Sequence, residues 1–153
     1  MPAPTTLTIA DVMTKNPICA TPGMTIRQLA TIFAERRISG APVVGADGTL
    51  VGVVSRTDLF RRVGLESKDV APSFLFDLLN DAIPASAQPV PESLLTIGDF
   101  MAESVITAAP TDRVADIAHR MATHKIHRVV VIDGQRKPLG IVTALDLLRV
   151  FPA

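Results

Sequence analysis

Two seven-residue stretches decide the fold of this chain: Gly52-Val53-Val54-Ser55-Arg56-Thr57-Asp58 and Gly140-Ile141-Val142-Thr143-Ala144-Leu145-Asp146. Both follow one pattern, in which a glycine and two apolar residues precede Ser or Thr, two variable residues and Asp. They lie 88 residues apart, and the same offset aligns Thr8–Arg61 with Thr96–Arg149 without a gap. Across these 54 positions 16 pairs are identical, against about three expected by chance at average composition. The chain is therefore an internal duplication.

Each copy predicts the same order of elements. A short extended segment (18–20 or 106–108) comes first, and an amphipathic helix follows, because apolar residues recur there at i, i+3, i+4 and i+7. The apolar stripe consists of Ile26, Leu29, Ala30 and Phe33 in the first copy and of Val114, Ile117, Ala118 and Met121 in the second. Thr25 and Thr111 are the expected caps of these two helices.

Two β-branched runs follow each amphipathic helix. In the first copy they span 42–44 and 50–54 and are joined by the turn residues Asp47-Gly48. In the second copy they span 128–132 and 139–142 and are joined through Asp133-Gly134. A last helix is expected to begin near Asp58 or Asp146. Each copy therefore has the predicted order β-α-β-β-α.

These observations define the expected fold class, which is α/β (α+β). A unit of about 55 residues is marginal alone, so we expect the two β-α-β-β-α repeats to pack sheet to sheet with pseudo-twofold symmetry and form two equivalent clefts. The predicted boundaries are 8–62 for repeat 1, 63–95 for the segment between the repeats and 96–151 for repeat 2. Within that segment, Phe74–Leu79 is a candidate short helix, and 83–91 is rich in Pro, Ala and Ser, as linkers are.

Composition narrows the class of protein. Fifteen basic and fifteen acidic side chains balance among 153 residues, which argues against nucleic-acid binding. The single Cys19 excludes internal disulfides and fits a reducing compartment. The sequence has no apolar run near the ~20 residues that span a bilayer. Met1 is followed by a short polar segment and not by a signal peptide, which favours a natural start; the alternative is a regulatory fragment of a longer protein. We expect a cytoplasmic protein that contacts neither nucleic acid nor membrane.

The two heptads resemble those of a tandem CBS-domain pair, often called a Bateman module. Three further segments support the resemblance: Asp11-Val12-Met13-Thr14, Asp99-Phe100-Met101 and residues 38–44. The resemblance covers about 108 of the 153 residues. It implies a stand-alone regulatory module that binds AMP, ADP, ATP or S-adenosylmethionine between the repeats and passes the signal to a partner or attached protein. It also implies a homodimer, because such modules pair through helices.

The resemblance and the chemistry of the heptads together suggest a ligand site in each copy. An Asp at a helix start can accept two hydrogen bonds from ribose hydroxyls. A nearby hydroxyl and the helix N–H groups suit an anion, and aliphatic side chains would hold adenine, because Trp and Tyr are absent. The candidate ligand-binding residues are Asp58, Asp146, Ser55, Thr143, Thr57, His127, Arg128, Ile18, Ile38, Ser39, Val53, Ile106, Ile126 and Ile141.

The pair His127-Arg128 makes the two copies unequal. It resembles the His-Arg pair that contacts phosphates in the nucleotide-sensing subunit of AMP-activated protein kinase, and Arg suits bidentate phosphate contact. Ser39-Gly40 occupies the equivalent positions in the first copy, where Arg56 is a candidate replacement. We therefore expect two clefts that differ in their preference for phosphorylated ligands.

Plainer interpretations stand beside these. Asp58 and Asp146 are also suited to capping helices, Ser55 and Thr143 to forming turns, and Arg128 and His127 to solvated strand ends. Met13 and Met101 are expected to fill the core and Cys19 to be a small buried hydrophobe.

The sequence also favours a non-enzyme. It contains no recognisable nucleophilic triad, Walker loop or G-x-G-x-x-G, so we expect no catalytic residue, no metal site and no required cofactor. The alternative function is a ligand-free scaffold for dimerisation or partner binding.

Overall fold

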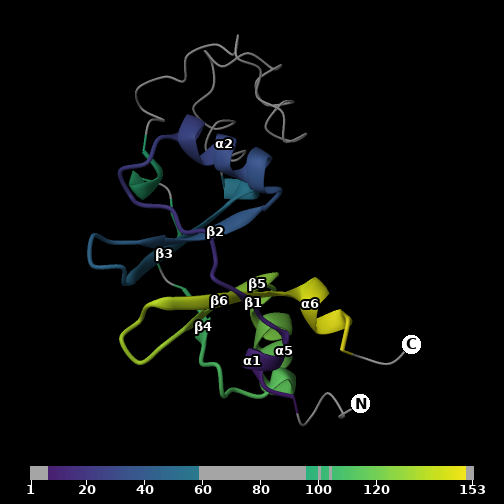
Figure 1. Ribbon diagram of the computed structural model, residues 1–153. Coiled ribbons are helices and arrows are strands. Elements are labelled where there is room, and N and C mark those ends of the chain that lie inside the picture. The colour runs from purple at the N-terminus through teal and green to yellow at the C-terminus, as the bar shows by residue number, and fades with distance from the viewer. Residues whose placement is uncertain (1–6, 59–95, 100, 104, 151–153) are drawn as a thin grey trace. The chain divides into compact units, whose positions relative to one another are not determined.

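The computed structural model of the chain (Figure 1) describes residues 7–58, 96–99, 101–103 and 105–150. Its elements are α1 (Ile9–Val12), β1 (Thr14–Lys15), α2 (Ile26–Arg36), β2 (Gly40–Val44), β3 (Leu50–Ser55), η4 (Ile97–Asp99), β4 (Thr107–Ala108), α5 (Val114–His124), β5 (Arg128–Ile132), β6 (Pro138–Thr143) and α6 (Ala144–Leu148). The expected mixture of strands and helices is confirmed. The predicted helix at Phe74–Leu79 and the linker at 83–91 lie outside the described residues.

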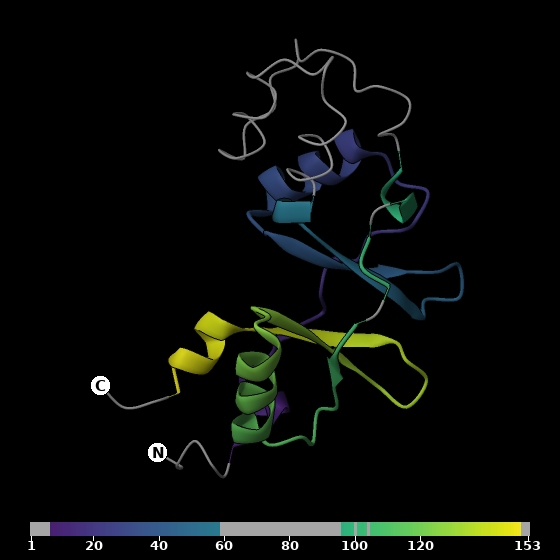
Figure 2. The same ribbon diagram turned by 180° about the vertical axis from the view of Figure 1, so that it is seen from behind.

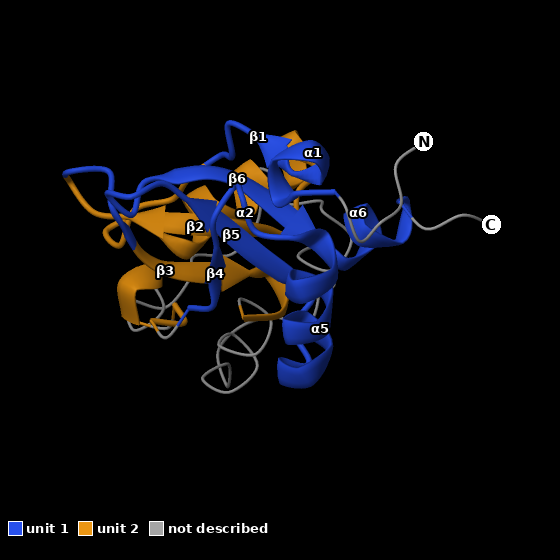
Figure 3. Ribbon diagram, turned by 90° about the horizontal axis from the view of Figure 1, so that it is seen from below, with its two compact units in different colours: residues 1–18, 47–50, 104–153 blue, residues 19–46, 51–103 orange. Residues whose placement is uncertain are grey.

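The chain divides into two compact units (Figure 3). Unit 1 contains residues 1–18, 47–50 and 104–153, and unit 2 contains residues 19–46 and 51–103. The units do not coincide with the two halves of the sequence, because the opening segment of each repeat belongs to the unit that holds the body of the other repeat. Residues 8–15 are in unit 1, and residues 97–102 are in unit 2.

Unit 1 is built on a four-stranded sheet in the order β1-β6-β5-β4. β5 and β6 form an antiparallel hairpin through the predicted Asp133-Gly134 turn, while β4 runs parallel to β5. The amphipathic helix α5 lies along one face of this sheet, as Figures 1 and 2 show from opposite sides. The apolar stripe predicted for α5 is buried at Val114, Ile117 and Met121, and Ala118 packs at the edge of the same cluster.

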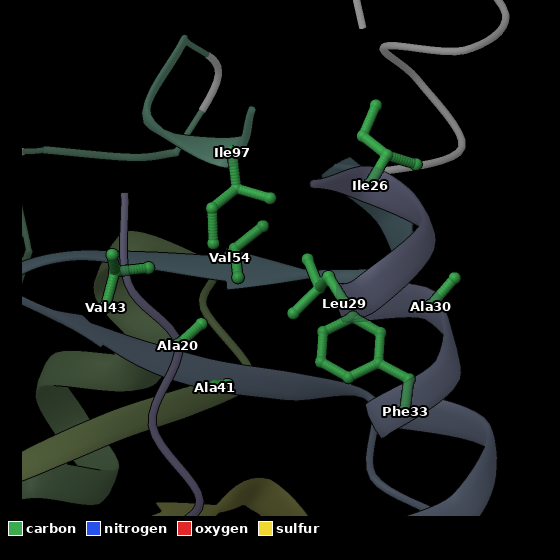
Figure 4. Close-up of a cluster of buried hydrophobic side chains, with 9 residues drawn as sticks. All are labelled: Ala20, Ile26, Leu29, Ala30, Phe33, Ala41, Val43, Val54 and Ile97. Carbon is green, nitrogen blue, oxygen red and sulfur yellow. The ribbon is translucent and has the colours of Figure 1, made fainter. Parts of the chain in front are cut away.

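Unit 2 repeats this plan with β2 and β3 at its centre. Ala20 bridges to Val43 in parallel, as β4 does to β5, and Ala102 bridges to Val53 in antiparallel, as β1 does to β6. The stripe on α2 is buried as predicted and packs onto the two strands (Figure 4). This buried cluster consists of Ala20, Ile26, Leu29, Ala30, Phe33, Ala41, Val43, Val54 and Ile97. Among the described residues, this cluster is thus aliphatic apart from Phe33.

The two long helices begin differently from one another. Thr25 caps α2 as predicted: its hydroxyl accepts the Gln28 N–H at 3.1 Å, and the Gln28 side chain accepts the Thr25 N–H at 2.9 Å. The prediction that Thr111 caps the second helix is wrong. Arg113 is the N-cap of α5 and makes no side-chain capping bond. The reason is that residues 109–112 form a turn of their own, in which the Asp112 carboxylate accepts the Ala109 N–H at 2.8 Å.

Candidate functional site: the two Ser/Thr-x-x-Asp helix starts

The last helix of each repeat begins two residues earlier than predicted. Residues 56–58 are helical in unit 2, and α6 begins at Ala144 in unit 1. Thr143 is the N-cap of α6, which places Asp146 at the third helical position. The interpretation of Asp146 as an N-cap is therefore wrong in detail. Thr143 is the N-cap, and Asp146 lies inside the helix, where its side chain accepts a hydrogen bond from the N-cap backbone.

In unit 1, Thr143 and Asp146 form a capping box. The Asp146 N–H donates to the Thr143 Oγ1 at 3.2 Å, and the Asp146 Oδ2 accepts the Thr143 N–H at 2.9 Å. The other carboxylate oxygen, Oδ1, lies 3.6 Å from Nη1 of Arg149, whose side chain is 70% exposed. An ion pair this exposed contributes little, so the capping box is what holds the carboxylate in place.

Unit 2 has the same arrangement at Ser55 and Asp58. The Asp58 N–H donates to the Ser55 Oγ at 3.1 Å, while the Asp58 Oδ2 accepts both the Ser55 N–H at 2.8 Å and the Ser55 hydroxyl at 2.9 Å. Both pairs are partly buried. A carboxylate offers about four acceptor positions, and the hydrogen bonds found among the described residues use one oxygen of Asp58. The carboxylate therefore has capacity to accept further donors.

Each helix start is tied to the beginning of a neighbouring strand. In unit 1 the Ala144 N–H donates to the His127 carbonyl at 2.8 Å, and Arg128 is the register partner of Thr143. The predicted residues Thr143, Asp146, His127 and Arg128 are thus brought together at one end of the β5–β6 hairpin. His127 is exposed and Arg128 half-buried.

In unit 2 the Arg56 N–H donates to the Ser39 carbonyl at 2.9 Å, so Ser39 occupies the place that His127 has in unit 1. Ser39 and Thr57 are exposed, and Ser55 is half-buried. The two helix starts have differently placed arginines nearby: unit 1 has Arg128 on a strand, whereas unit 2 has Arg56 on the helix. The side-chain Nε of Arg56 is buried.

The six aliphatic residues predicted to line the pockets are all half-buried. Ile106, Ile126 and Ile141 belong to unit 1, while Ile38 and Val53 belong to unit 2. Ile18 also falls in unit 1, so the structure does not place it in one unit with Ser55. Ile38 and Ile126 pack against the buried cores of their units.

Sequence reasoning missed the segments that lie beside these helix starts. β1 pairs with β6, the strand that ends at Thr143, and Ala102 bridges to β3, the strand that ends at Ser55. The repeated Asp11-x-Met13 and Asp99-x-Met101 mark both segments in the sequence. They carry no signal for which repeat receives them, because each repeat offers the same plan of strand edge and glycine.

The remaining chemistry-bearing groups lie elsewhere. Cys19 is half-buried, not buried as predicted, and its partial burial raises the pKa of the thiol, which disfavours the reactive thiolate. Among the described residues, no three His, Cys, Asp or Glu side chains gather closely enough to hold a metal ion. No helix in the described part of the chain is long and apolar enough to cross a membrane.

Two α+β units, each with a Ser/Thr-x-x-Asp capping box at a helix start, define the class: a tandem repeat of two related α+β domains. The sequence model of the CBS domain family matches residues 9–64 and, a second time, residues 97–153. The chain belongs to the CBS domain family and carries two copies of the domain, which confirms the resemblance seen in the sequence.

Known proteins agree with this assignment. The chain is 31% identical over 150 residues to the uncharacterized protein MJ1426 of Methanocaldococcus jannaschii, covering 92% of this chain and 89% of that one. It resembles the CBS domain pair of protein MJ0100, solved with 5′-methylthioadenosine and S-adenosyl-L-methionine, with a TM-score of 0.73, 26% identity and 95% of each chain covered. It also resembles CBSX2 solved with AMP, with a TM-score of 0.70, 26% identity and 93% of each chain covered.

Proposed function

We propose that this chain is a regulatory module, without catalysis of its own, that binds an adenosine-containing ligand at the helix start of each unit. The observation that carries the proposal is the capping box, which holds a partly buried carboxylate at a defined position. The solved CBS pairs that resemble this chain hold AMP, S-adenosylmethionine or 5′-methylthioadenosine. AMP, ADP, ATP and S-adenosylmethionine are the candidate regulatory ligands.

The proposed contacts follow from the acceptors at each site. The carboxylate of Asp146 or Asp58 accepts hydrogen bonds from the ribose hydroxyls, and the capping box orients it for this purpose. Capping and ribose binding are therefore compatible roles, because the capping bonds leave acceptor positions on the carboxylate. The half-buried Ile126 and Ile141 in unit 1, and Ile38 and Val53 in unit 2, provide aliphatic surface for adenine.

The proposed ligand preference differs between the units. Arg128 and His127 favour a phosphorylated ligand in unit 1, since an arginine fork matches phosphate geometry. In unit 2 the strand start carries Ser39, and Arg56 is the candidate cation. The signal is proposed to reach a partner protein in the cytoplasm, the compartment that a single reduced Cys19 fits.

Titration calorimetry with AMP, ATP, S-adenosylmethionine and adenosine tests the proposal. Asp146→Asn keeps the size and capping capacity of the side chain but removes its charge. It should weaken adenosine-ligand binding in unit 1 by roughly 1–3 kcal/mol, the scale of hydrogen bonds to charged groups. Asp133→Asn, in the β5–β6 turn, is the matched control and should leave affinity unchanged. Equal affinities for the wild-type chain and Asp146→Asn would sink the ribose assignment.

The role of Arg128 has its own test. Arg128→Ala should weaken the binding of AMP and ATP and spare adenosine, which has no phosphate. An equal loss for adenosine would make Arg128 a structural residue of the strand.

A second candidate function, a dimerisation scaffold, is favoured by the surface of α6. Leu145 and Leu148 lie one turn apart on this helix and are 58% and 66% exposed. Two exposed leucines on one helix suit an apolar contact with a second copy of this chain. Sedimentation equilibrium of the wild-type chain and of Leu145→Gln/Leu148→Gln tests this: the variant should be monomeric where the wild type dimerises. A wild-type chain that stays monomeric at tens of micromolar contradicts it.

A further inference from the structure

The opening segments of the two repeats are exchanged. We call residues 8–15 the first arm and residues 97–102 the second arm. The first arm is fastened to unit 1 at two places: the Ile9 N–H donates to the Asp112 carbonyl at 2.8 Å, and β1 pairs with β6 with Thr14 opposite Ile141. The side chain of Ile9 is fully buried in the unit 1 core.

The second arm is fastened to unit 2 in the same way. The Ile97 N–H donates to the Met24 carbonyl at 3.0 Å, and Ala102 and Val53 exchange two backbone hydrogen bonds of 2.9 and 3.0 Å. Ile97 is fully buried in the unit 2 core. Each arm therefore has an anchor before the long helix of the receiving unit and another on the strand that leads to a Ser/Thr-x-x-Asp helix start.

A methionine in each arm covers the glycine that opens the heptad of the other repeat. A Cβ atom on Gly140 would lie 2.8 Å from the Met13 sulfur, and one on Gly52 would lie 2.8 Å from the Met101 sulfur. The glycine is the residue that admits the arm so closely, because any side chain would occupy the space of the thioether. Three residues after each glycine comes the hydroxyl residue of the capping box, Thr143 or Ser55.

We propose that each arm positions the ligand site of the other repeat, with Met13 a positioning residue for Thr143 and Asp146 and Met101 for Ser55 and Asp58. The identity of the ligand rests on the proposed function, whereas the link between each arm and the capping box of the other repeat does not. β6 lies between β1 and β5, so removal of the arm turns it into an edge strand with unpaired backbone groups. The capping box follows directly on that strand, and its position depends on the strand being held on both sides.

The mechanical link is tested without ligand, by hydrogen exchange. Met13→Ala should speed exchange of the Thr143 and Asp146 amides about five- to tenfold, the lower range of typical couplings, and leave Ser55 and Asp58 unchanged. Met101→Ala should do the reverse. Met121→Ala, which truncates a buried side chain of α5 in unit 1, is the control: it lowers overall stability, yet it should not speed capping-box exchange beyond the average of its unit.

Ligand binding should act through the same link in the other direction, because coupling between two sites is reciprocal. In Asp58→Asn, where unit 1 keeps its intact site, AMP should slow exchange in residues 8–16. In Asp146→Asn, AMP should slow exchange in residues 97–103. The response is thus crosswise to the sequence: the arm of one repeat reports on the site of the other.

The outcomes separate the two proposals. If AMP protects the arm of its own repeat, or if Met13→Ala loosens Ser55 and Asp58 as much as Thr143 and Asp146, the inference is overturned. If the methionine variants behave as expected and no adenosine ligand binds the wild-type chain, the arms still position the helix starts, and the proposed function fails instead.

Discussion

Gly140 and Gly52 offer a test of how closely the arms are packed. An alanine Cβ at position 140 would lie 2.7 Å from the carbonyl oxygen of Thr14 and 2.8 Å from the sulfur of Met13. Ordinary contact begins near 3.4 Å, so the arm would have to move by about 0.7 Å. The carbonyl oxygen belongs to β1, which is paired with β6, and it cannot retreat without straining that pairing.

The magnitude follows from two opposing effects. Overpacking a well-filled site costs about 1–3 kcal/mol, while replacing Gly by Ala at a permitted backbone conformation stabilises the fold by about 0.4–1 kcal/mol through the unfolded chain. The clash outweighs the entropic gain. We expect Gly140→Ala to lower the free energy of unfolding by about 1–2 kcal/mol, and Gly52→Ala to do the same, because Ala102 and Met101 crowd it equally.

Thermal and denaturant unfolding measure the effect, and a chain of this length should lose about 2–4 °C in melting temperature for each kcal/mol. Gly134 and Gly23 are matched controls, one in each unit, because a Cβ at either position meets nothing within 4 Å. Gly134→Ala and Gly23→Ala should be neutral or slightly stabilising. If Gly140→Ala is as mild as Gly134→Ala, the close contact between arm and strand is absent and the reasoning fails.

Three further predictions concern local structure. Lys125, after α5, and Arg136, in the β5–β6 turn, have left-handed backbones with φ of 54° and 60°, so Lys125→Gly and Arg136→Gly should each raise stability by about 0.5–1 kcal/mol; a drop in melting temperature would contradict this. Thr25→Ala removes the capping hydroxyl of α2 and should cost about 1 kcal/mol in denaturant unfolding. Hydrogen bonds from Thr8 hold the pKa of Asp11 below its usual 3.8. The stabilisation from that carboxylate is therefore present above about pH 4 and lost as the pH falls through the lowered pKa. Asp11→Asn should flatten the acid dependence of exchange in residues 8–15, and an unchanged profile would refute this.

Much of the local structure followed from the sequence because its causes are local. The apolar stripe of α2 and its Thr25 cap depend on residues within one or two turns of one another. The hairpins likewise followed from β-branched runs on either side of the predicted turn residues. Where local reasoning failed at Thr111, the competing structure was also local: a turn closed by Asp112 took up the residues before α5.

The two helix starts lie two residues before their predicted positions. The spacing Ser/Thr-x-x-Asp is itself a capping-box signature, so the sequence contained the signal that Asp58 and Asp146 lie inside the helix. The prediction instead places the start of each helix near Asp58 or Asp146. The clustering of His127, Arg128 and Thr143 depends on the β5–β6 register, which pairs Arg128 with Thr143, 15 positions later, and is set by packing of the whole hairpin.

By itself, the sequence determined that the chain is a duplication, that each copy alternates strands with amphipathic helices, and which residues stand at the helix starts. Only the tertiary structure decided where the two arms dock. Ile9 and Ile97 are buried in the unit of the other repeat, a choice that no property of an arm's own residues specifies. The physical reason is that each duplicated repeat offers an arm the same plan of docking surface, a strand edge with a glycine opposite the methionine. Which one receives each arm is decided by chain connectivity and by the packing of distant residues, and these exist only in the folded protein.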